Sequence, residues 1–313
     1  MGVPQLREGR MHAPIRVVGL IACAVLIGVA ASPAAADLED YLGKYTGENG
    51  EGYLRPLVDA IGADLNSGIF RSGYVPADGF HLSLETPIMA AFFGDDDRVF
   101  MAAPSEGFDP DDPVEAPTAV GQTEYVYVAG INDTRDGFPG GLDLSSFALA
   151  APQIRVGSVM GTEAILRYLA IDVGDSDIGK IDLFGMGLKH SISQYLDEPP
   201  WGMDMSAGFF WQNITIGDEL MDATAFTAGV QASKRYVGGF ATAEPYVGLG
   251  FDTFSMDASY EDDQGTDIDL SFESETSFRG TVGLNLSAAF FTLYGEYSIA
   301  NVNTFGFGLG LGF

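Results

Sequence analysis

Apolar and polar side chains alternate in segments of about ten residues from Gly79 onward, and this period constrains the fold more than any other feature. In the clearest segment, residues 303–313, glycines alternate with Phe305, Phe307, Leu309, Leu311 and Phe313. A period of two places these five side chains on one face of a β-strand. The chain is therefore expected to be built from strands.

A soluble β-sandwich produces the same alternation, so other features must distinguish it from a membrane barrel. The strands are about as long as tilted spanning strands must be. Their other faces are rich in Gly, Ser and Thr, and the sequence stops on an aromatic residue. No run of about 18 apolar residues follows residue 36, so no spanning helix is expected. We predict an all-β fold, a single transmembrane antiparallel β-barrel with a short N-terminal amphipathic helix.

The strands of this barrel can be placed by the same period. They are expected near residues 80–92, 122–130, 146–159, 163–172, 179–194, 202–214, 223–234, 240–260, 267–286, 290–298 and 303–313. Bacterial barrels have an even number of strands, so about 12 is the working number and about 10 to 14 the range. A strand is most easily missed in residues 94–121.

Residues 1–36 have the layout of a cleaved secretory signal peptide. Arg7, Arg10 and Arg16 precede the apolar run 17–31, and three alanines at 34–36 form a cleavage site. A membrane anchor and a lipid attached to Cys23 are weaker alternatives. The expected organisation is a signal peptide at 1–36, an N-terminal helical segment at 37–78 and an outer-membrane β-barrel at 79–313.

The helical segment has one apolar stripe, formed by Leu54, Leu57, Val58, Ile61 and Leu65. The inner wall of the barrel reads as Gly, Ser, Thr and paired charges, which are poor partners for such a stripe. The membrane interface or an apolar patch at the periplasmic mouth suits it better. We expect the helix to cap or flank the periplasmic end without threading the barrel.

The net charge of −29 and the single cysteine, Cys23, limit the partners. So acidic a chain repels nucleic acid. No disulfide or thiolate metal site is possible after residue 36. The runs Asp95–Asp97 and Glu261–Asp263 could take divalent cations but lack the spacing of a Ca²⁺ loop, so solvated loop tips are the favoured reading. No resident metal or cofactor is expected. The expected partners are outer-membrane lipid, lipopolysaccharide and, through the terminal strand, the barrel-assembly machinery.

Strand parity also assigns charged side chains to the lumen. Eight are expected there, namely Arg155, Arg167, Lys189, Arg279, Glu163, Asp204, Glu244 and Glu296. Buried charges need partners, so the two signs should pair across a narrow lumen. This balance favours a filled barrel over a wide channel.

Two histidines lie on predicted strands. His81, Ser83 and Glu85 share one face, a spacing similar to that of outer-membrane lipid hydrolases, although the plain polar face of a strand explains it better. His190 falls on the lipid-facing side near Trp201, which suits an interfacial position. We therefore do not expect an enzyme.

Several short motifs also resemble a known family. They include Ala151-Pro-Gln-Ile-Arg-Val-Gly157, Leu183-Phe-Gly-Met-Gly-Leu-Lys-His190, Gln231-Ala-Ser-Lys234 and Tyr294-Gly-Glu-Tyr297. In this order they resemble an uncharacterised family of Gram-negative outer-membrane β-barrel proteins. The resemblance implies a barrel with an N-terminal helical segment and brings no activity or site residues.

The cell outer membrane is therefore the expected location. A narrow, porin-like solute permeation or uptake channel is the leading function. A structural or surface-interaction barrel without transport is the alternative, and an outer-membrane lipid hydrolase comes third.

Overall fold

The computed structural model describes residues 48–103, 113–129, 135–172, 180–217, 220–261 and 267–312. Residues 1–47, including the expected signal peptide, lie outside the described residues, as does Phe313. The boundary expected at residue 36 is therefore not addressed by the structure.

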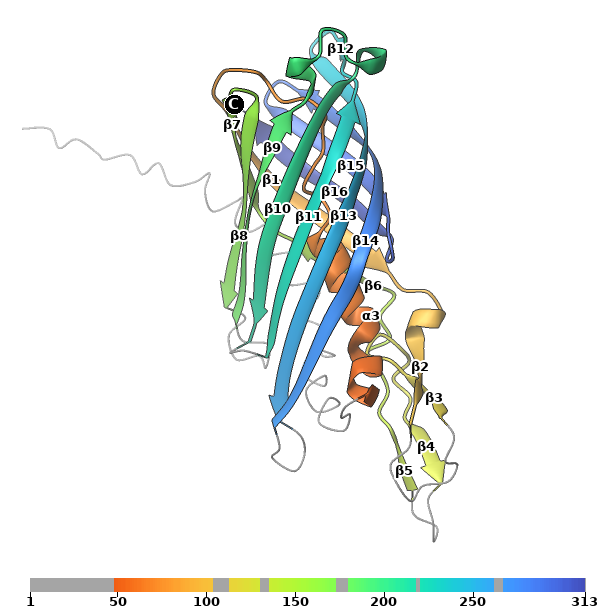
Figure 1. Cartoon of the computed structure of the whole chain (residues 1–313). Coiled ribbons are helices and arrows are strands. Elements are labelled where there is room, and N and C mark those ends of the chain that lie inside the picture. Colours follow the sequence, from red (N-terminus) through yellow and green to blue (C-terminus); the bar gives the residue numbers. More distant parts are fainter. Residues whose placement is uncertain are drawn as a thin grey trace, which may run out of the picture.

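Ten antiparallel strands close into a barrel (Figure 1). They are β1 (His81–Phe92), β7 (Gln153–Val159), β8 (Thr162–Asp172), β9 (Lys180–Ser191), β10 (Asp204–Ile216), β11 (Met221–Ser233), β13 (Ala241–Glu261), β14 (Asp267–Ala288), β15 (Phe291–Ile299) and β16 (Thr304–Gly312). Pairing of β1 with β16 and of β11 with β13 closes the ring. The short strand β6 (Ser146–Ala150) extends the β7 side of β1, and β12 (Tyr236–Gly238) pairs with the start of β13.

The strand number lies within the range expected from the sequence and below the working number of about 12. The difference comes from residues 93–145, between β1 and β6. Here β2 (Val99–Ala102) pairs with β3 (Val114–Pro117), and β4 (Val126–Ala129) pairs with β5 (Arg135–Phe138). The strand expected near 122–130 therefore belongs to a hairpin outside the ring.

The two ends of the barrel differ. One end, called the turn end here, carries the tight turns at 160–161 and 289–290 and the end of β16. The other, called the loop end, carries residues 93–145 (Figure 1). The remaining described helices are short 3-10 turns, namely η2 (Asp96–Arg98), η4 (Ser193–Tyr195) and η5 (Pro200–Gly202).

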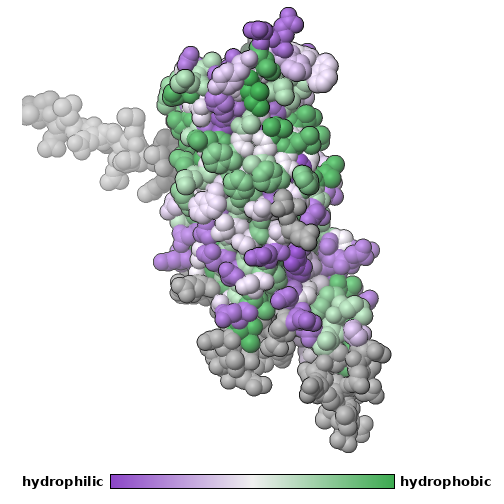
Figure 2. Space-filling model, viewed as in Figure 1, coloured by the Kyte–Doolittle hydropathy of each residue, from purple (hydrophilic) through white to green (hydrophobic). Residues whose placement is uncertain are grey.

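An apolar belt surrounds the barrel between two rings of aromatic side chains. Exposed aromatic residues near the turn end are Phe80, Tyr195, Trp201, Tyr236, Phe240, Phe290 and Phe291. A second ring crosses neighbouring strands at Tyr168, Phe184, Trp211, Phe251 and Phe278. Figure 2 shows the apolar surface between polar bands. A lipid-facing band flanked by aromatic girdles is the mark of a membrane-spanning barrel.

The polarity of the wall reverses beyond the second ring, towards the loop end. There the outward side chains are acidic and exposed, namely Asp172, Asp182, Asp222, Asp257, Asp269 and Glu273. The inward ones are apolar and buried, namely Leu169, Leu183, Ile214, Phe254, Met256, Leu270 and Phe272. The strand parity is kept while the surroundings change, because this part of the wall has water outside and an apolar element inside.

That element is the helix α3 (Glu48–Leu65), which lies inside the loop end (Figure 1). Its apolar stripe packs against the reversed part of the wall as one hydrophobic cluster. The approach is close, since a Cβ at Gly62 would lie 2.7 Å from the Phe254 ring. No described helix is long and apolar enough to cross a membrane.

The expectation that this helix caps the periplasmic mouth is therefore wrong. That expectation treats the lumen as uniformly polar, which would leave the apolar stripe without a partner inside the barrel. The loop-end half of the wall supplies that partner, with Leu183, Ile214 and Phe254 among the buried contacts. Burying a large apolar side chain is worth about 1.5–3 kcal/mol, so the helix is held firmly.

The position of the belt makes one prediction. Val247 and Ser255 both face outward on β13, the first within the belt and the second beyond it. Arginine at Val247 should lower the free energy of unfolding by about 2–4 kcal/mol, whereas arginine at Ser255 should change it by about 0–1 kcal/mol. Urea unfolding of the barrel in lipid vesicles measures both. Equal effects at the two positions would contradict this placement of the membrane.

Candidate functional site

The lumen holds a continuous piece of chain. From the end of α3, residues 66–76 run inside the ring towards the turn end, and residues 77–80 are exposed there and lead into β1 (Figure 1). We call residues 48–80 the plug. Its helical half is held by apolar contacts. Its extended half, residues 66–80, is held mainly by polar groups of the wall and by a small apolar cluster of Ile69 with Ile165 and Phe210. The contacts between this extended half and the wall form the candidate site.

Arg167 on β8 is a central part of that contact and is fully buried. One of its terminal nitrogens donates to the carbonyl of Leu65 at 3.1 Å, and the other to the carbonyl of Ser67 at 3.1 Å. Gln212 and Gln153 accept its remaining hydrogen bonds at 3.2 Å and 3.1 Å. The guanidinium thus fixes the point where the helix ends and the extended segment begins.

Arg279 on β14 makes a similar contact from another side of the ring. Its Nη2 donates to the carbonyl of Ala63 at 3.2 Å, and its Nη1 donates to Ser67 Oγ at 2.7 Å. Its Nε donates to the Asp252 carboxylate at 2.6 Å. Hydrogen bonds from a charged group are about twice as strong as neutral ones, so Arg279 ties wall and plug together.

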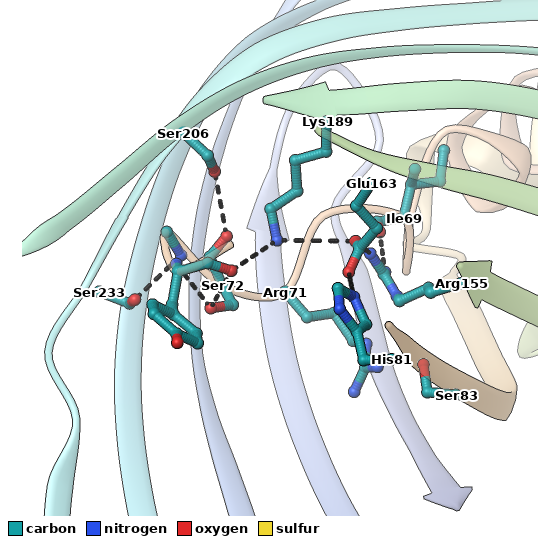
Figure 3. A network of polar contacts seen from close by, with 12 residues as sticks. Ile69, Arg71, Ser72, His81, Ser83, Arg155, Glu163, Lys189, Ser206 and Ser233 are labelled. Atoms are coloured by element: carbon teal, nitrogen blue, oxygen red, sulfur yellow. Dashed lines mark hydrogen bonds and ion pairs between the residues drawn. The ribbon is translucent and has the colours of Figure 1, made fainter. Parts of the chain in front are cut away.

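An ion-pair network fills the lumen nearer the turn end. Figure 3 shows Arg155, His81 and Lys189 converging on Glu163. The distances from Glu163 are 3.0 Å to Arg155 Nη1, 2.9 Å to His81 Nε2 and 3.9 Å to Lys189 Nζ. Because buried charges require partners, this cluster is stable only with all of its members in place.

Glu85 on β1 joins the plug to the same network. It pairs with Arg71 of the plug and, at 3.0 Å, with Arg155 of the wall. Arg71 also lies over the Tyr294 ring, 4.0 Å from its centre. The carboxylate therefore sits between a cation that belongs to the plug and one that belongs to the wall.

The plug also donates to the wall through its backbone. The amide of Gly68 donates to Glu296 at 2.8 Å, and the amide of Gly73 donates to Ser233 Oγ at 2.9 Å. Glu296 also accepts from the Tyr246 hydroxyl at 2.7 Å. Wall side chains thus satisfy two amides of an extended segment that forms no sheet, as buried amides require.

Cavities remain around the plug in the described part of the barrel. The loop-end cavity has a volume of about 240 Å³, a central one about 30 Å³ and the turn-end one about 190 Å³. The central volume holds about one water molecule. The plug therefore leaves no wide opening through the described part of the barrel.

Burial raises the pKa of the Asp64 carboxyl on α3 well above its usual range, and nearby Arg279 opposes this.

The charged residues assigned to the lumen from the sequence lie as follows. Buried inside the ring are Arg155, Arg167, Lys189, Arg279, Glu163 and Glu296. Glu244 is partly exposed and accepts from Ser72 of the plug at 2.5 Å. Asp204 is also partly exposed and pairs with Arg235 at 3.1 Å, at the turn end. Most of these charges contact the plug or each other instead of lining an open channel.

Sequence reasoning missed two kinds of site residue. Asp252 has the inward parity of Glu244 on the same strand, so the period could have identified it. Asn66, whose side-chain amide donates to the carbonyl of Thr253 at 3.2 Å, is the second kind, together with Arg71. Both lie in a segment without any period, and nothing in the sequence points to their partners.

The histidines make contacts that the sequence did not indicate. Ser83 Oγ donates to Glu85 at 2.9 Å, while His81 Nε2 lies against Glu163, so the hydroxyl is not directed to the imidazole as nucleophilic catalysis requires. His190 contacts Thr162 at 2.8 Å and the Tyr195 hydroxyl at 2.9 Å near the turn-end girdle.

The terminal strand and the acidic runs complete the expected sites. Phe305, Phe307 and Leu309 face outward and are exposed, Leu311 is partly exposed, and Phe313 lies outside the described residues. Asp95–Asp97 surrounds the turn η2, and residues 262–266 lie outside the described residues. Among the described residues, no three His, Cys, Asp or Glu side chains gather as a metal site would require.

The sequence of this chain matches one protein-family model. A family model described as a family of unknown function, DUF6588, matches residues 14–313. The chain belongs to this family. No curated protein matches it.

Solved structures with some similarity are membrane barrels. The β domain of the Bordetella autotransporter BrkA is 10% identical, with 75% of this chain and 99% of that one covered and a TM-score of 0.30. OmpT of Vibrio cholerae, an outer membrane protein lacking loop L8, is 12% identical over 75% and 98% of the chains, with a TM-score of 0.25. The toluene transporter TbuX of Ralstonia pickettii is 9% identical over 77% and 90%, with a TM-score of 0.24. Similarities of this size transfer no function.

The shared carboxylate of Glu85 leads to a prediction. Glu85→Gln leaves Arg71 and Arg155 without their common partner, which should cost about 3–5 kcal/mol and release the plug from the wall. Trypsin should then cleave after Arg71, which is buried in the native barrel. Ser83→Ala, the control, removes a single hydrogen bond to Glu85 and should leave the chain resistant. A Glu85→Gln variant as resistant as the native protein would refute the role of this pair.

Proposed function

We propose that this protein is a gated permeation barrel of the outer membrane, closed by its own plug. The belt, the two girdles and the closed ring support a place in a membrane that admits barrels. Such barrels have short turns on the periplasmic side and longer loops outside, so the turn end faces the periplasm. The acidic loop end then faces the exterior, where divalent cations and lipopolysaccharide are its expected partners.

The observation that carries the proposal is the different way in which the two halves of the plug are held. Apolar contacts hold α3, and breaking them would expose apolar surface to water, which is unfavourable. Hydrogen bonds and ion pairs hold most of residues 66–80, apart from a small apolar cluster of Ile69 with Ile165 and Phe210. Water can replace a neutral hydrogen bond at a net cost of about 0.5–1.5 kcal/mol and one to a charged group at about 1.5–3 kcal/mol. The helix is thus a fixed anchor, and the extended segment is the part that can move to open the barrel.

A disulfide between plug and wall tests the gate in the full chain. Ser67 Oγ lies 2.8 Å from Thr304 Oγ1, so cysteines at these positions can come within bonding distance. The native protein should show channel openings in planar bilayers at raised voltage. Oxidation of the cysteine pair should abolish them, because residues 66–80 can no longer leave the wall, and reduction should restore them.

A wall-to-wall pair is the matched control. Ser287 Oγ on β14 and Thr292 Oγ1 on β15 lie 2.9 Å apart, and their hydrogen bond joins two wall strands without involving the plug. Cross-linking them should leave the openings unchanged. Openings that survive the Ser67–Thr304 cross-link, or a protein that is silent in both oxidation states, would contradict a gated channel.

A surface-interaction role is the second candidate, and one observation favours it. The loop end exposes Met101, Tyr125 and Tyr127, with the two tyrosine rings 4.6 Å apart. Aromatic side chains of this kind are enriched in protein interfaces. A silent barrel whose binding to cell surfaces falls when Tyr127 is replaced by Ser would favour this role over permeation.

A further inference from the structure

Two of the cavities lie on the same side of the plug and share two lining residues. The loop-end cavity lies between α3, the β13–β14 wall and the turn at 300–302. The central cavity lies between residues 66–70 and strands β11, β13, β14 and β15. Asn66 and Arg279 line both of them. The space beside the plug is therefore nearly continuous from the loop end to the middle of the barrel.

The wall along this side is built from small residues. The central cavity is lined by Gly229, Gly248, Gly250, Thr227, Thr281 and Ser298. A Cβ at Gly248 would meet no atom closer than 3.6 Å. The remaining space is about the size of one water molecule. A small widening would therefore let water molecules pass through it in single file.

Unpartnered oxygen atoms are a second, independent observation. Asn66 Oδ1, Gln231 Oε1, Asp252 Oδ1 and Ser277 Oγ are buried and find no hydrogen-bond partner among the described residues. All four residues line one or both of these cavities. Leaving a buried acceptor unsatisfied costs about 1–3 kcal/mol, so these oxygen atoms point to water or a cation as their partner.

Arg279 stands where the two cavities meet. Its guanidinium reaches from the Asp252 carboxylate on the wall to Ser67 and the carbonyl of Ala63 on the plug. A fixed positive charge at this junction repels cations and occupies the space between wall and plug. Turning this one side chain away would join the cavities without moving α3.

We propose that a path for water and small inorganic cations follows the β13–β15 side of the plug, with Arg279 as the residue that closes it. The charged groups lining the two cavities are Asp59, Asp252, Glu296, Arg55 and Arg279. With Arg279 withdrawn, carboxylates and neutral oxygen atoms dominate, and such linings select cations. This rests on the proposed gated barrel and names its permeant ion and its closing residue.

The test is Arg279→Gln in the full chain, measured in planar bilayers across a potassium chloride gradient. The variant should raise the open probability roughly tenfold or more, since a charged hydrogen bond is worth about that factor in an equilibrium. The reversal potential should show cation selectivity.

Arg167→Gln is the matched control, because Arg167 also donates to two plug carbonyls but lines neither cavity. It also loosens the plug but uncovers neither cavity, so its channels should open less often than those of Arg279→Gln and should lack the cation selectivity. Equal opening by both variants would show general loosening of the plug, and an anion-selective Arg279→Gln channel would refute the cation path.

A labelling experiment covers the case in which Arg279→Gln does not fold. In a Cys23→Ser background, which removes the chain's single cysteine, Ser277→Cys should react with a charged thiol reagent several times faster than Gln212→Cys on β10, a position that lines neither cavity. Equal rates would overturn the path.

This result separates the two proposals. If the Ser67–Thr304 cross-link controls conductance while Ser277→Cys stays unreactive, the gate stands and this path is wrong. If no variant conducts, the gated barrel itself fails.

Discussion

The bilayer core offers no hydrogen-bond partner, and the rest of the structure depends on that constraint. Every strand edge must be paired, so β1 joins β16 and the ring closes. The outer surface must be apolar for as far as lipid extends and no farther. On β13, Val247 and Leu249 meet this need, and the outward residues from Ser255 onward are polar. The girdle residue Phe251 marks the change.

Closing the ring creates a lumen, and the same constraint decides what fills it. Within the belt, the inward face carries charged groups that have no lipid or bulk water to solvate them. They are satisfied by one another and by the plug backbone, as Arg167 and Glu85 show. Beyond the belt, the inward face is apolar and buries α3. A plug with an apolar helical half and a mainly polar extended half follows from these two zones.

The sequence was sufficient to predict the barrel and which side chains face inward or outward along much of its wall. Alternation at residues 303–313 and along β13 predicted strands and their faces, because a period of two is a local property of the chain. The position of the helix could not be read in this way. The apolar residues that receive it, such as Leu183 and Phe254, come from strands far apart in sequence, and only closure of the ring brings them together. Arg71 and Asn66 lie in an aperiodic segment, so their contacts were also beyond sequence reasoning.

Closure of the lumen by the plug is the central claim, and amide hydrogen exchange in lipid vesicles tests it most directly. The amides of Gly68 and Gly73 are buried and donate to Glu296 and Ser233 of the wall. They should exchange as slowly as amides of the barrel strands, and far more slowly than Gly239 in the turn after β12. Exchange of Gly68 and Gly73 at the rate of an unstructured chain would show that the plug does not occupy the barrel.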